Sequence, residues 1–416
     1  MNTTKKHLII IGGGFAGPQL SRLLGNSAFH ITLIDQQNHH QFQPLYYQVA
    51  SARLEPSNIS FPFRKVFQNE RSVEFRLAKV ISIQPQQNEI TTDIGTMPYD
   101  YLVIATGCTT NFFGNANIQA HSLAMKTTEE AIGIRNHMLL NFENIIAQGN
   151  TNDAAAMTIA LVGAGPTGVE LAGSFAEMKR QVLPKDYPNT DFSALRIILL
   201  EGSPFTLLNF SAASQKASRT YLEQLGVEVI TGVTVTNYDG NLINLSNNTS
   251  IPCKNLVWAA GVTGNTIPGI PKENTIRNRY IVNRRNLITD SQNIYALGDI
   301  AYMVTPKYPN GHPQVANVAI NQAKLLAKNL LRLQKNKPLL DYEYRDLGSM
   351  ATIGKHKAVV DLPFVHFQGR FAWFIWMFLH LMLILSVRNK LAIFTNWAWN
   401  YITNDNSLRL ILRPKK

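Results

Sequence analysis

The chain contains 416 residues, 45% of them hydrophobic and 16% charged, and carries a formal net charge of +12. This length allows two or three domains with full cores, and the composition is that of a globular enzyme. The only two cysteines, Cys108 and Cys253, are far apart, which excludes a disulfide framework and a Cys-x-x-Cys redox pair. The positive charge indicates an anionic partner, but no zinc-ligand spacing or RNA-binding motif accompanies it, so neither a metal nor nucleic acid is expected.

The first predicted element is a buried parallel strand, Leu8–Ile11, which leads into a glycine-rich turn. Such a turn lets backbone N–H groups approach a pyrophosphate at the N-terminus of the next helix. The following strand, Ile31–Ile34, ends at Asp35, which is placed to accept a hydrogen bond from a ribose hydroxyl. Because this first strand feeds the turn, no cleaved targeting segment is expected. The glycines of this fingerprint are Gly12, Gly14 and Gly17.

A second copy of the same pattern follows the predicted strand Thr158–Val162. Its next strand, Ile197–Leu200, ends at Glu201; the spacing is longer than the usual ~20 residues, which indicates an insertion around Pro184–Asp191. A carboxylate at Glu201 would repel a 2′-phosphate, so NADH is favoured over NADPH. The alternative is that both glycine sets serve packing alone. The glycines of the second fingerprint are Gly163, Gly165 and Gly168.

Two further strands close the two repeats in the same way, Tyr101–Ile104 before Ala-Thr-Gly and Leu256–Trp258 before Ala-Ala-Gly. The chain then returns to the first lobe with a short strand from Asn293 that is followed by Gly298 and Asp299, and with a periodic helix from about Val315 to Leu333. The predicted fold is therefore α/β with two Rossmann-like lobes.

Taken together, these residues resemble the flavoproteins with two dinucleotide-binding domains, and within them the type II, non-pumping, single-subunit NADH:quinone oxidoreductases. The motifs that carry the resemblance span nearly the whole chain. They are Gly-Gly-Gly-Phe-Ala-Gly at 12–17, Phe-Gln-Pro-Leu at 42–45, Tyr-Gln-Val-Ala at 47–50, Ala-Thr-Gly at 105–107, Asn-Phe-Phe-Gly at 111–114, Gly-Val-Glu-Leu-Ala-Gly at 168–173, Ala-Leu-Gly-Asp at 296–299 and Gly-Ser-Met-Ala-Thr-Ile-Gly at 348–354.

The resemblance implies FAD in a discontinuous first domain, residues 1–118 and 275–345, NADH in residues 119–274, and a membrane-associated region at 346–416. Asp35 would hold the adenosine ribose of FAD, Val80 would meet the adenine through its backbone, and Asp299 would bind the ribityl chain. Asp299 is also explained as an ordinary turn residue after a strand. The remaining residues implied for the cofactors are Gly12, Gly14, Gly17, Thr106, Gly107 and Gly298 for FAD, and Gly163, Gly165, Gly168 and Glu201 for NADH.

In the resembling family a helix after the Gly-Asp turn carries two glutamines at the flavin edge and quinone site, whereas this chain has Asn317 and Asn321. Each side chain is one methylene shorter, a loss in reach of roughly 1.5 Å, and misplacement of about 1 Å can slow a reaction on the order of 100-fold. We expect both asparagines to contact quinone or flavin. The alternative is a solvated helix face, since Lys324 and Lys328 continue the same spacing.

Glu170 lies in the first turn of the second glycine-rich helix. The resemblance implies that it relays protons to the reduced quinone. The alternative is that it lines an ordinary polar face with Ser174 and Glu177 and is favoured there by the helix dipole.

The electron acceptor is expected to be external, because relatives that reduce disulfides or oxidise sulfide need paired cysteines. A membrane quinone is the expected acceptor, reduced by two electrons from NADH through FAD. No proton pumping is expected, because the sequence has no set of ionisable residues inside several membrane spans. Two alternatives stay open: a ferredoxin-type protein acceptor, and an NADH-binding redox sensor that does not turn over. A homodimer is compatible with the sequence.

An apolar, uncharged run covers residues 371–387. As one helix it would be about 26 Å long, short of the ~30 Å hydrocarbon core of a membrane. Trp397, Trp399 and Tyr401 follow, beside a polar stripe of Asn396, Asn400 and Thr403. This pattern predicts a monotopic anchor on anionic lipid at the cytoplasmic face of the plasma membrane; a spanning helix and a buried core helix are the alternatives. The basic residues from position 370 onward are Arg370, Arg388, Lys390, Arg409, Arg413, Lys415 and Lys416, against one acid, Asp405.

Overall fold

The computed structural model describes residues 5–403 and 408–412, so Asp405, Arg413, Lys415 and Lys416 of the basic tail lie outside the described residues. The chain forms two compact units. Unit 1 comprises residues 1–41, 61–109 and 262–346, and unit 2 comprises residues 42–60, 110–261 and 347–416. Each unit is built from three separate stretches of chain.

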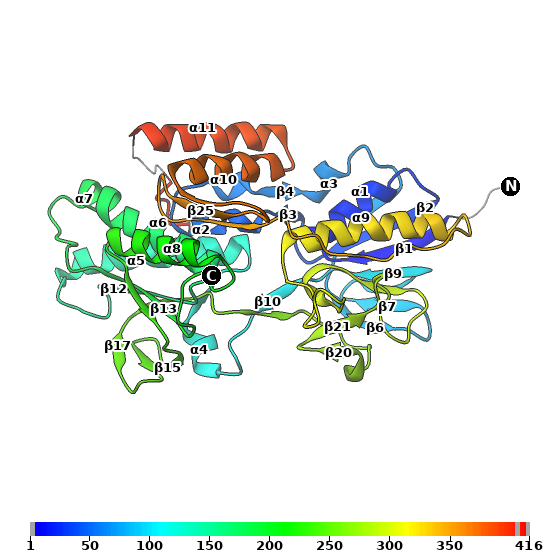
Figure 1. The fold of residues 1–416 in the computed structure, drawn as a ribbon, viewed down its shortest axis with the longest axis horizontal. Coiled ribbons are helices and arrows are strands. Elements are labelled where there is room, and N and C mark those ends of the chain that lie inside the picture. The colour runs from blue at the N-terminus through cyan, green and yellow to red at the C-terminus, as the bar shows by residue number, and fades with distance from the viewer. Residues whose placement is uncertain (1–4, 404–407, 413–416) are drawn as a thin grey trace. The chain divides into compact units, whose positions relative to one another are not determined.

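Unit 1 is organised around a five-stranded parallel sheet in the order β22-β9-β1-β2-β5. Leu8 and Ile10 of β1 face a core formed with α1 (Ala16–Leu24) and α9 (Ala316–Leu333), and Figure 1 shows these two helices side by side. Ile9 and Ile11 face the opposite core, as the two-residue period of a strand requires. The strands are β1 (Lys6–Ile11), β2 (Phe29–Asp35), β5 (Val73–Leu77), β9 (Tyr101–Ile104) and β22 (Ile294–Ala296).

Smaller sheets and turns complete unit 1. An antiparallel meander, β6-β7-β8, contributes to the second core, and β20-β21-β23 form another three-stranded sheet. These and the remaining elements are β3 (His39–Gln41), β4 (Ser60–Pro62), α3 (Phe63–Val66), β6 (Val80–Gln84), β7 (Glu89–Thr92), β8 (Gly95–Pro98), β10 (Cys108–Thr110), β19 (Val262–Gly264), η4 (Lys272–Asn274), β20 (Thr275–Ile276), β21 (Arg279–Val282), η5 (Gly298–Ile300) and β23 (Ala301–Met303).

Unit 2 repeats the design with a second five-stranded parallel sheet, β11-β18-β12-β13-β14. Strand β12 is buried along its whole length, as expected for a central parallel strand covered on both faces. The helix α6 (Pro166–Glu177) continues through a π-helical turn, η3 (Met178–Val182), into α7 (Leu183–Asp186). The strands are β11 (Leu123–Ala124), β12 (Thr158–Val162), β13 (Arg196–Glu201), β14 (Glu228–Thr231) and β18 (Asn255–Trp258).

The other elements of unit 2 are several helices, a meander equivalent to that of unit 1, and a C-terminal sheet with two helices. Figure 1 shows this sheet and these two helices as neighbouring ribbons in orange and red. These other elements are η1 (Gln43–Leu45), α2 (Tyr46–Ala50), η2 (Pro56–Asn58), α4 (Ala116–His121), α5 (Thr128–Gln148), α8 (Ala212–Gln224), β15 (Val235–Tyr238), β16 (Leu242–Leu245), β17 (Ser250–Pro252), β24 (Ser349–Thr352), β25 (Ala358–Asp361), β26 (His366–Gly369), α10 (Arg370–Leu383) and α11 (Val387–Thr403).

The predicted nucleotide-binding strands, the closing strands and the helix α9 are confirmed. The apolar run at 371–387 is not one helix, however. Helix α10 ends at Leu383, the chain is extended at Ile384, and α11 begins at Val387. In the described part of the chain no helix has the length and apolar character to cross a membrane.

Candidate cofactor and quinone sites

In the first glycine turn, two of the three fingerprint glycines are packed against backbone atoms and the third borders open space. Gly12 has a φ of +109°, and a Cβ on it would lie 2.3 Å from the Ala105 carbonyl oxygen. A Cβ on Gly17 would lie 2.0 Å from the Gly12 carbonyl oxygen, whereas one on Gly14 would meet nothing within 4 Å. Gly12 and Gly17 are therefore required by close backbone packing, and Gly14 borders open space into which a pyrophosphate fits.

Asp35, at the end of β2, holds this turn through both carboxylate oxygens. Gly13 N–H donates to Oδ2 at 2.5 Å and Gln37 N–H donates to Oδ1 at 2.7 Å. Burial raises the pKa of Asp35, and these hydrogen bonds counteract the effect in part. The Asp35 carbonyl accepts from Ala78 N–H at 3.0 Å, which holds the chain just before β6, a strand that begins at Val80, against the end of β2.

A second turn of unit 1, Gly298–Asp299, is fixed by three side chains. Gln322 Oε1 accepts from Gly298 N–H at 2.7 Å, and Gln314 Nε2 donates to the Asp299 carbonyl at 3.1 Å. The Cys108 thiol donates to Asp299 Oδ2 at 3.0 Å. Gln322 is fully buried and its Nε2 has no hydrogen-bond partner among the described residues, so an unpaired donor lies beside this turn.

Thr106 and Gly107 lie directly before Cys108. Thr106 Oγ1 donates to the Asn265 carbonyl at 2.7 Å, and Asn265 N–H donates to the Gly107 carbonyl at 3.1 Å. Gly107 has a φ of +66°, and a Cβ there would meet nothing within 4 Å. These contacts fix the end of β9 while leaving the Gly107 backbone accessible.

The second glycine turn reproduces the first. A Cβ on Gly163 would lie 2.6 Å from the Ala259 carbonyl oxygen, and one on Gly168 would lie 1.9 Å from the Gly163 carbonyl oxygen. A Cβ on Gly165 would again meet nothing within 4 Å. Glu201 takes the place of Asp35, accepting from Ala164 N–H at 2.6 Å and from Ser203 N–H at 2.8 Å.

Asn317 and Asn321 are half-buried on α9 and bonded to each other. Asn321 Nδ2 donates to Asn317 Oδ1 at 2.6 Å, and Asn317 Nδ2 donates to the Arg345 carbonyl at 3.3 Å. Lys324 and Lys328 are exposed, so the predicted solvated face begins only beyond the asparagines. The asparagine pair thus holds the end of a segment that runs from Pro338 to Arg345.

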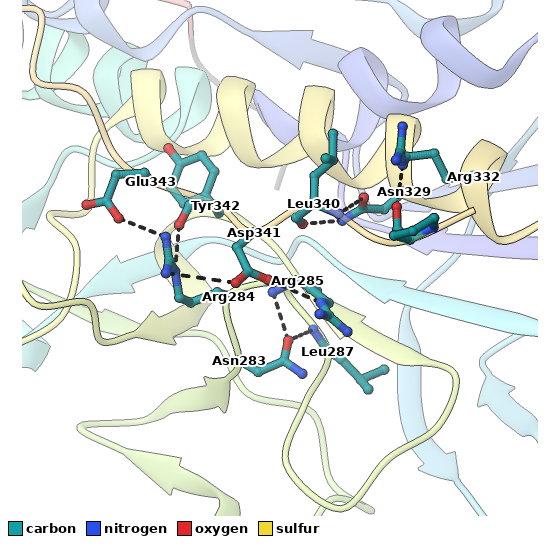
Figure 2. A network of polar contacts seen from close by, with 11 residues as sticks. Asn283, Arg284, Arg285, Leu287, Asn329, Arg332, Leu340, Asp341, Tyr342 and Glu343 are labelled. Atoms are coloured by element: carbon teal, nitrogen blue, oxygen red, sulfur yellow. Dashed lines mark hydrogen bonds and ion pairs between the residues drawn. The ribbon is translucent and has the colours of Figure 1, made fainter. Parts of the chain in front are cut away.

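Figure 2 shows how the rest of that segment is attached. Asn329 of α9 makes a two-bond contact with the backbone of Leu340, at 2.8 Å in each direction. Arg284 donates to Glu343 at 2.9 Å and Arg285 donates to Asp341 at 3.1 Å. These pairs lie at the surface, where an ion pair contributes at most about 1 kcal/mol, so the backbone contacts to α9 are the stronger constraint.

Helix α6 begins at Pro166 and has no acid in its first turn, so the prediction that Glu170 lies there is wrong; Glu170 follows in the second turn. It belongs to a buried stretch of the helix, not to an exposed polar face. Glu170, Ser174 and Glu177 are all buried, which removes the alternative of a solvated helix side. Glu170 Oε1 accepts from Thr352 N–H at 3.2 Å. Burial raises the pKa of Glu170 to about 8, against the effect of hydrogen bonds from the backbone and side chain of Thr352.

Close packing of two glycines brings the segment after β24 against α6. A Cβ on Gly173 would lie 2.6 Å from the Gly354 nitrogen. Glu177 accepts from the backbone N–H of Lys355 and forms an ion pair with Arg53 at 2.7 Å between Nη1 and Oε2. Both ends of this Arg53–Glu177 pair are largely buried.

A pocket of unit 2 opens beside this cluster. Its wall combines aromatic rings from α2, α10 and α11 with polar and cationic groups from α2, α11 and the segments after α2 and β24. Trp376 is buried and its indole Nε1 has no partner among the described residues. The lining residues are Tyr47, Gln48, Arg53, Gly354, Lys355, Trp373, Trp376, Trp397, Asn400 and Tyr401.

Helices α10 and α11 expose their apolar side. Phe371 is 67% exposed, Trp399 60% and Ile402 78%, whereas Asn400 of the predicted polar stripe is only partly exposed and its carbonyl accepts from the Lys355 ammonium at 2.8 Å. A soluble helix has the opposite arrangement. The other large exposed apolar side chains of this surface are Phe374, Phe378, Leu379, Met382, Leu383, Leu385, Val387, Leu391, Phe394 and Tyr401.

Comparison with known proteins identifies the family. Residues 6–323 match the pyridine nucleotide-disulphide oxidoreductases and residues 347–404 match the NDH2 C-terminal domain. A type II NADH:quinone oxidoreductase of Mycobacterium tuberculosis, Ndh, is 31% identical over 418 residues, covering 96% of this chain and 89% of that protein. The chain belongs to the type II NADH:quinone oxidoreductases. It is an FAD-dependent enzyme that oxidises NADH and reduces quinone.

Further comparisons agree in sequence or in fold. The type II NADH:quinone oxidoreductase of Staphylococcus aureus is 25% identical over 86% of this chain and 90% of its own length. The structure of NDH2 from Plasmodium falciparum in complex with NADH matches with a TM-score of 0.88 at 20% identity, over 98% of this chain and 100% of that one. The sulfide:quinone oxidoreductase of Aquifex aeolicus shares the fold, with a TM-score of 0.73 at 21% identity.

The residues of unit 1 fit FAD. The open face of Gly14 between two closed glycine positions leaves room for a pyrophosphate, and the unpaired Gln322 amide donor lies beside the Gly298–Asp299 turn. Sequence reasoning missed Gln322, Cys108 and Thr352 as residues that orient site groups. The signal available for Gln322 was its place next to Asn321; nothing local marks Thr352.

Proposed function

We propose that this type II NADH:quinone oxidoreductase binds peripherally to a membrane through α10 and α11 and takes its quinone from that membrane. The observation that carries the proposal is the outward-facing apolar side of these helices, because a surface of this kind is stabilised by burial in lipid. Arg370 and Arg388 are exposed at the ends of the apolar run, which favours an anionic surface such as the cytoplasmic leaflet of a plasma membrane.

The geometry of the two glycine turns supports a proposed site for each nucleotide. FAD is held by Gly12, Gly14 and Gly17, with Asp35 on its ribose and Val80 at its adenine. Thr106, Gly107, Gly298 and Asp299 hold the remainder of the cofactor. NADH is held by Gly163, Gly165, Gly168 and Glu201. Bound FAD supplies the two-electron chemistry that connects NADH oxidation to quinone reduction.

Glu170 supplies a proton to the reduced quinone. Support comes from its burial on α6, a helix that packs against α2 and β24, and from a raised pKa of about 8, which keeps a proton on the carboxyl group at neutral pH. Glu170→Gln removes this proton, so the pH dependence of kcat with a short-chain quinone should flatten. An unchanged profile would remove Glu170 from the mechanism.

Asn317 and Asn321 are proposed to contact the quinone or the flavin. Asn317→Gln and Asn321→Gln each restore one methylene, and we expect a change in quinone KM of several-fold. If both variants leave quinone affinity and turnover unchanged, the asparagines serve only to hold the segment ending at Arg345.

The membrane proposal is tested with charged substitutions on the exposed apolar surface. Phe378→Glu and Ile402→Glu change side chains that are more than half exposed, so the fold should survive while sedimentation with anionic vesicles is lost. Phe205→Glu, on an exposed residue of unit 2 outside α10 and α11, is the matched control. Equal vesicle binding by all three variants would contradict the proposal.

A further inference from the structure

A chain of hydrogen bonds connects α11 with the buried Glu170. Trp397 Nε1 donates to Gln48 Oε1 at 2.8 Å, and Gln48 Nε2 donates to the Tyr47 hydroxyl at 2.9 Å. The Tyr47 hydroxyl and Thr352 Oγ1 are 3.0 Å apart. Thr352 in turn contacts Glu170 through its backbone and its side chain.

The direction of these hydrogen bonds is decided at Trp397. An indole N–H donates and cannot accept, so the oxygen of the Gln48 amide must face Trp397 and the nitrogen must face Tyr47. The Tyr47 oxygen therefore accepts from Gln48. Its own proton has Thr352 Oγ1 as the one acceptor that the described residues provide.

The same logic extends to the carboxyl group. Because Thr352 Oγ1 accepts from Tyr47, its proton is free to point at Glu170, where it donates alongside the Thr352 backbone N–H. Tyr47 retains its proton, since burial raises the pKa of this phenol. A carboxylate that accepts two hydrogen bonds is stabilised relative to the neutral acid.

We propose that Trp397 is a positioning residue for the proton-handling group of this enzyme: its indole N–H fixes the orientation of Gln48, Tyr47 and Thr352 so that each donates toward Glu170. The inference rests on the proposed role of Glu170 in delivering a proton to quinone. It connects a helix whose other face is exposed and apolar with a carboxyl group inside unit 2.

The other charged groups around Glu170 do not provide this orientation. The nearest on the same helix, Glu177, is paired with Arg53 and with the backbone of Lys355. Strand β12, which also packs against α6, has no charged residue. The charged residues of the remaining elements packed against α6 lie at strand ends, in other contacts or at the surface; they are Lys179, Arg180, Arg196, Glu201, Lys216, Arg219 and Glu223.

The test is a pH titration of Glu170 in the FAD-loaded enzyme without quinone. The titration is monitored through the infrared C=O band of the protonated carboxyl group, which is identified as the band that is absent in Glu170→Gln. Trp397→Phe keeps the aromatic ring and removes the N–H. Since Thr352 is then no longer held as a donor, the pKa of Glu170 should rise by about 0.5–1, the size expected from one hydrogen bond. Thr352→Val, which removes the final donor, should raise it at least as much.

Trp399→Phe is the matched control, because Trp399 lies on the same helix with its side chain exposed, and it should leave the titration unchanged. An unchanged titration in Trp397→Phe, or an equal shift in Trp399→Phe, would overturn the proposal. Because this titration requires no quinone turnover, it is independent of whether Glu170 protonates quinone. Whether Glu170 protonates quinone is tested separately by the pH dependence of kcat. Trp397→Phe should shift the part of this pH profile that Glu170→Gln abolishes.

Discussion

The two glycine turns of the chain share their geometry and differ in what surrounds them. In both, the first and third glycines are closed by backbone carbonyls, the middle glycine borders open space, and a carboxylate from the second strand accepts two backbone N–H groups. Unit 1 adds the Gly298–Asp299 turn, fixed by side chains from β10 and the α9 region. Unit 2 adds a buried acid on the helix itself, Glu170.

The two units therefore share the geometry of the glycine turn. Their different chemistry is set by the residues that each unit adds around that turn. Helix α1 contains no acidic residue and packs its buried side against an apolar core. Helix α6 carries Glu170 and Glu177 inside unit 2. The first site is thereby suited to retain a cofactor, and the second to exchange a substrate beside a proton-bearing group.

The largest effects should come from filling the open space at the middle glycines. Gly14→Val places a side chain where a Cβ meets no protein atom within 4 Å, so the apoprotein should keep its melting temperature while FAD affinity falls by about 100-fold or more. Gly165→Val should instead retain FAD and raise the KM for NADH by a similar factor. Flavin fluorescence and anaerobic reduction by NADH measure the two outcomes. Loss of FAD from both variants would show that the two sites are not separable.

The next largest effect should come from removing Asp299, the carboxylate of the additional turn in unit 1. Asp299→Ala deletes a charged acceptor, and a hydrogen bond to a charged group contributes about 1.5–3 kcal/mol, so FAD should bind about 10–100-fold more weakly. Isothermal titration of the apoprotein with FAD provides the measurement. NADH binding to unit 2 should stay unchanged, and a parallel loss there would point to unfolding instead.

Glu170, the buried acid on the glycine-turn helix of unit 2, predicts that the stability of the folded enzyme depends on pH. The pKa of Glu170 is about 8 in the folded chain and 4.5 in its ordinary state. Between these values the folded state binds the extra proton, so its stability falls as pH rises. The melting temperature should drop by a few degrees more between pH 6 and 9 in the wild-type enzyme than in Glu170→Gln. Identical slopes would mean that burial does not hold the proton.

The two carboxylates proposed to bind ribose, Asp35 and Glu201, can be distinguished by their consequences for nucleotide choice. Glu201→Gln removes the charge that repels a 2′-phosphate but keeps one oxygen acceptor for the turn, so the ratio of kcat/KM for NADPH over NADH should rise about tenfold. Asp35→Asn should leave this ratio unchanged and weaken FAD. A Glu201→Gln enzyme that still rejects NADPH to the same degree would assign the discrimination to other residues.

The smallest expected effect concerns the thiol beside Asp299. Cys108→Ala removes one hydrogen bond, which contributes about 0.5–1.5 kcal/mol, so the Kd for FAD should increase about 2–10-fold. Cys108→Ser keeps a donor at this position and should bind FAD like the wild-type enzyme. If the serine variant is as weak as the alanine variant, the thiol contributes packing and not orientation.

The sequence is most informative where the physical constraint is local. The β-branched strands before each glycine turn, the following acids Asp35 and Glu201, and the helix up to Leu333 could be predicted because each depends on neighbouring residues. Contacts between distant segments carry no such signal. That Trp397 reaches Gln48, or that Thr352 contacts Glu170, follows only from the fold.

The C-terminal helices show a different limit of sequence reasoning. The uncharged run at 371–387 contains no proline or glycine that would mark the break after Leu383. The polar stripe of α11 does not indicate by itself whether it faces the solvent or the protein. Polar residues usually face outward, but on a helix at a lipid surface they do not face the lipid. In the structure Asn400 lines the pocket of unit 2 and Ile402 is exposed.

The position of β22 at the edge of the first sheet has a consequence for biosynthesis. Strands β1, β2, β5 and β9 are complete once residue 104 has left the ribosome, but β22 and the Gly298–Asp299 turn arrive almost two hundred residues later. By then residues 110–261, with the whole second parallel sheet, have been synthesised. Because domains fold as their chain emerges, the nucleotide fold encoded second can be finished before the one encoded first.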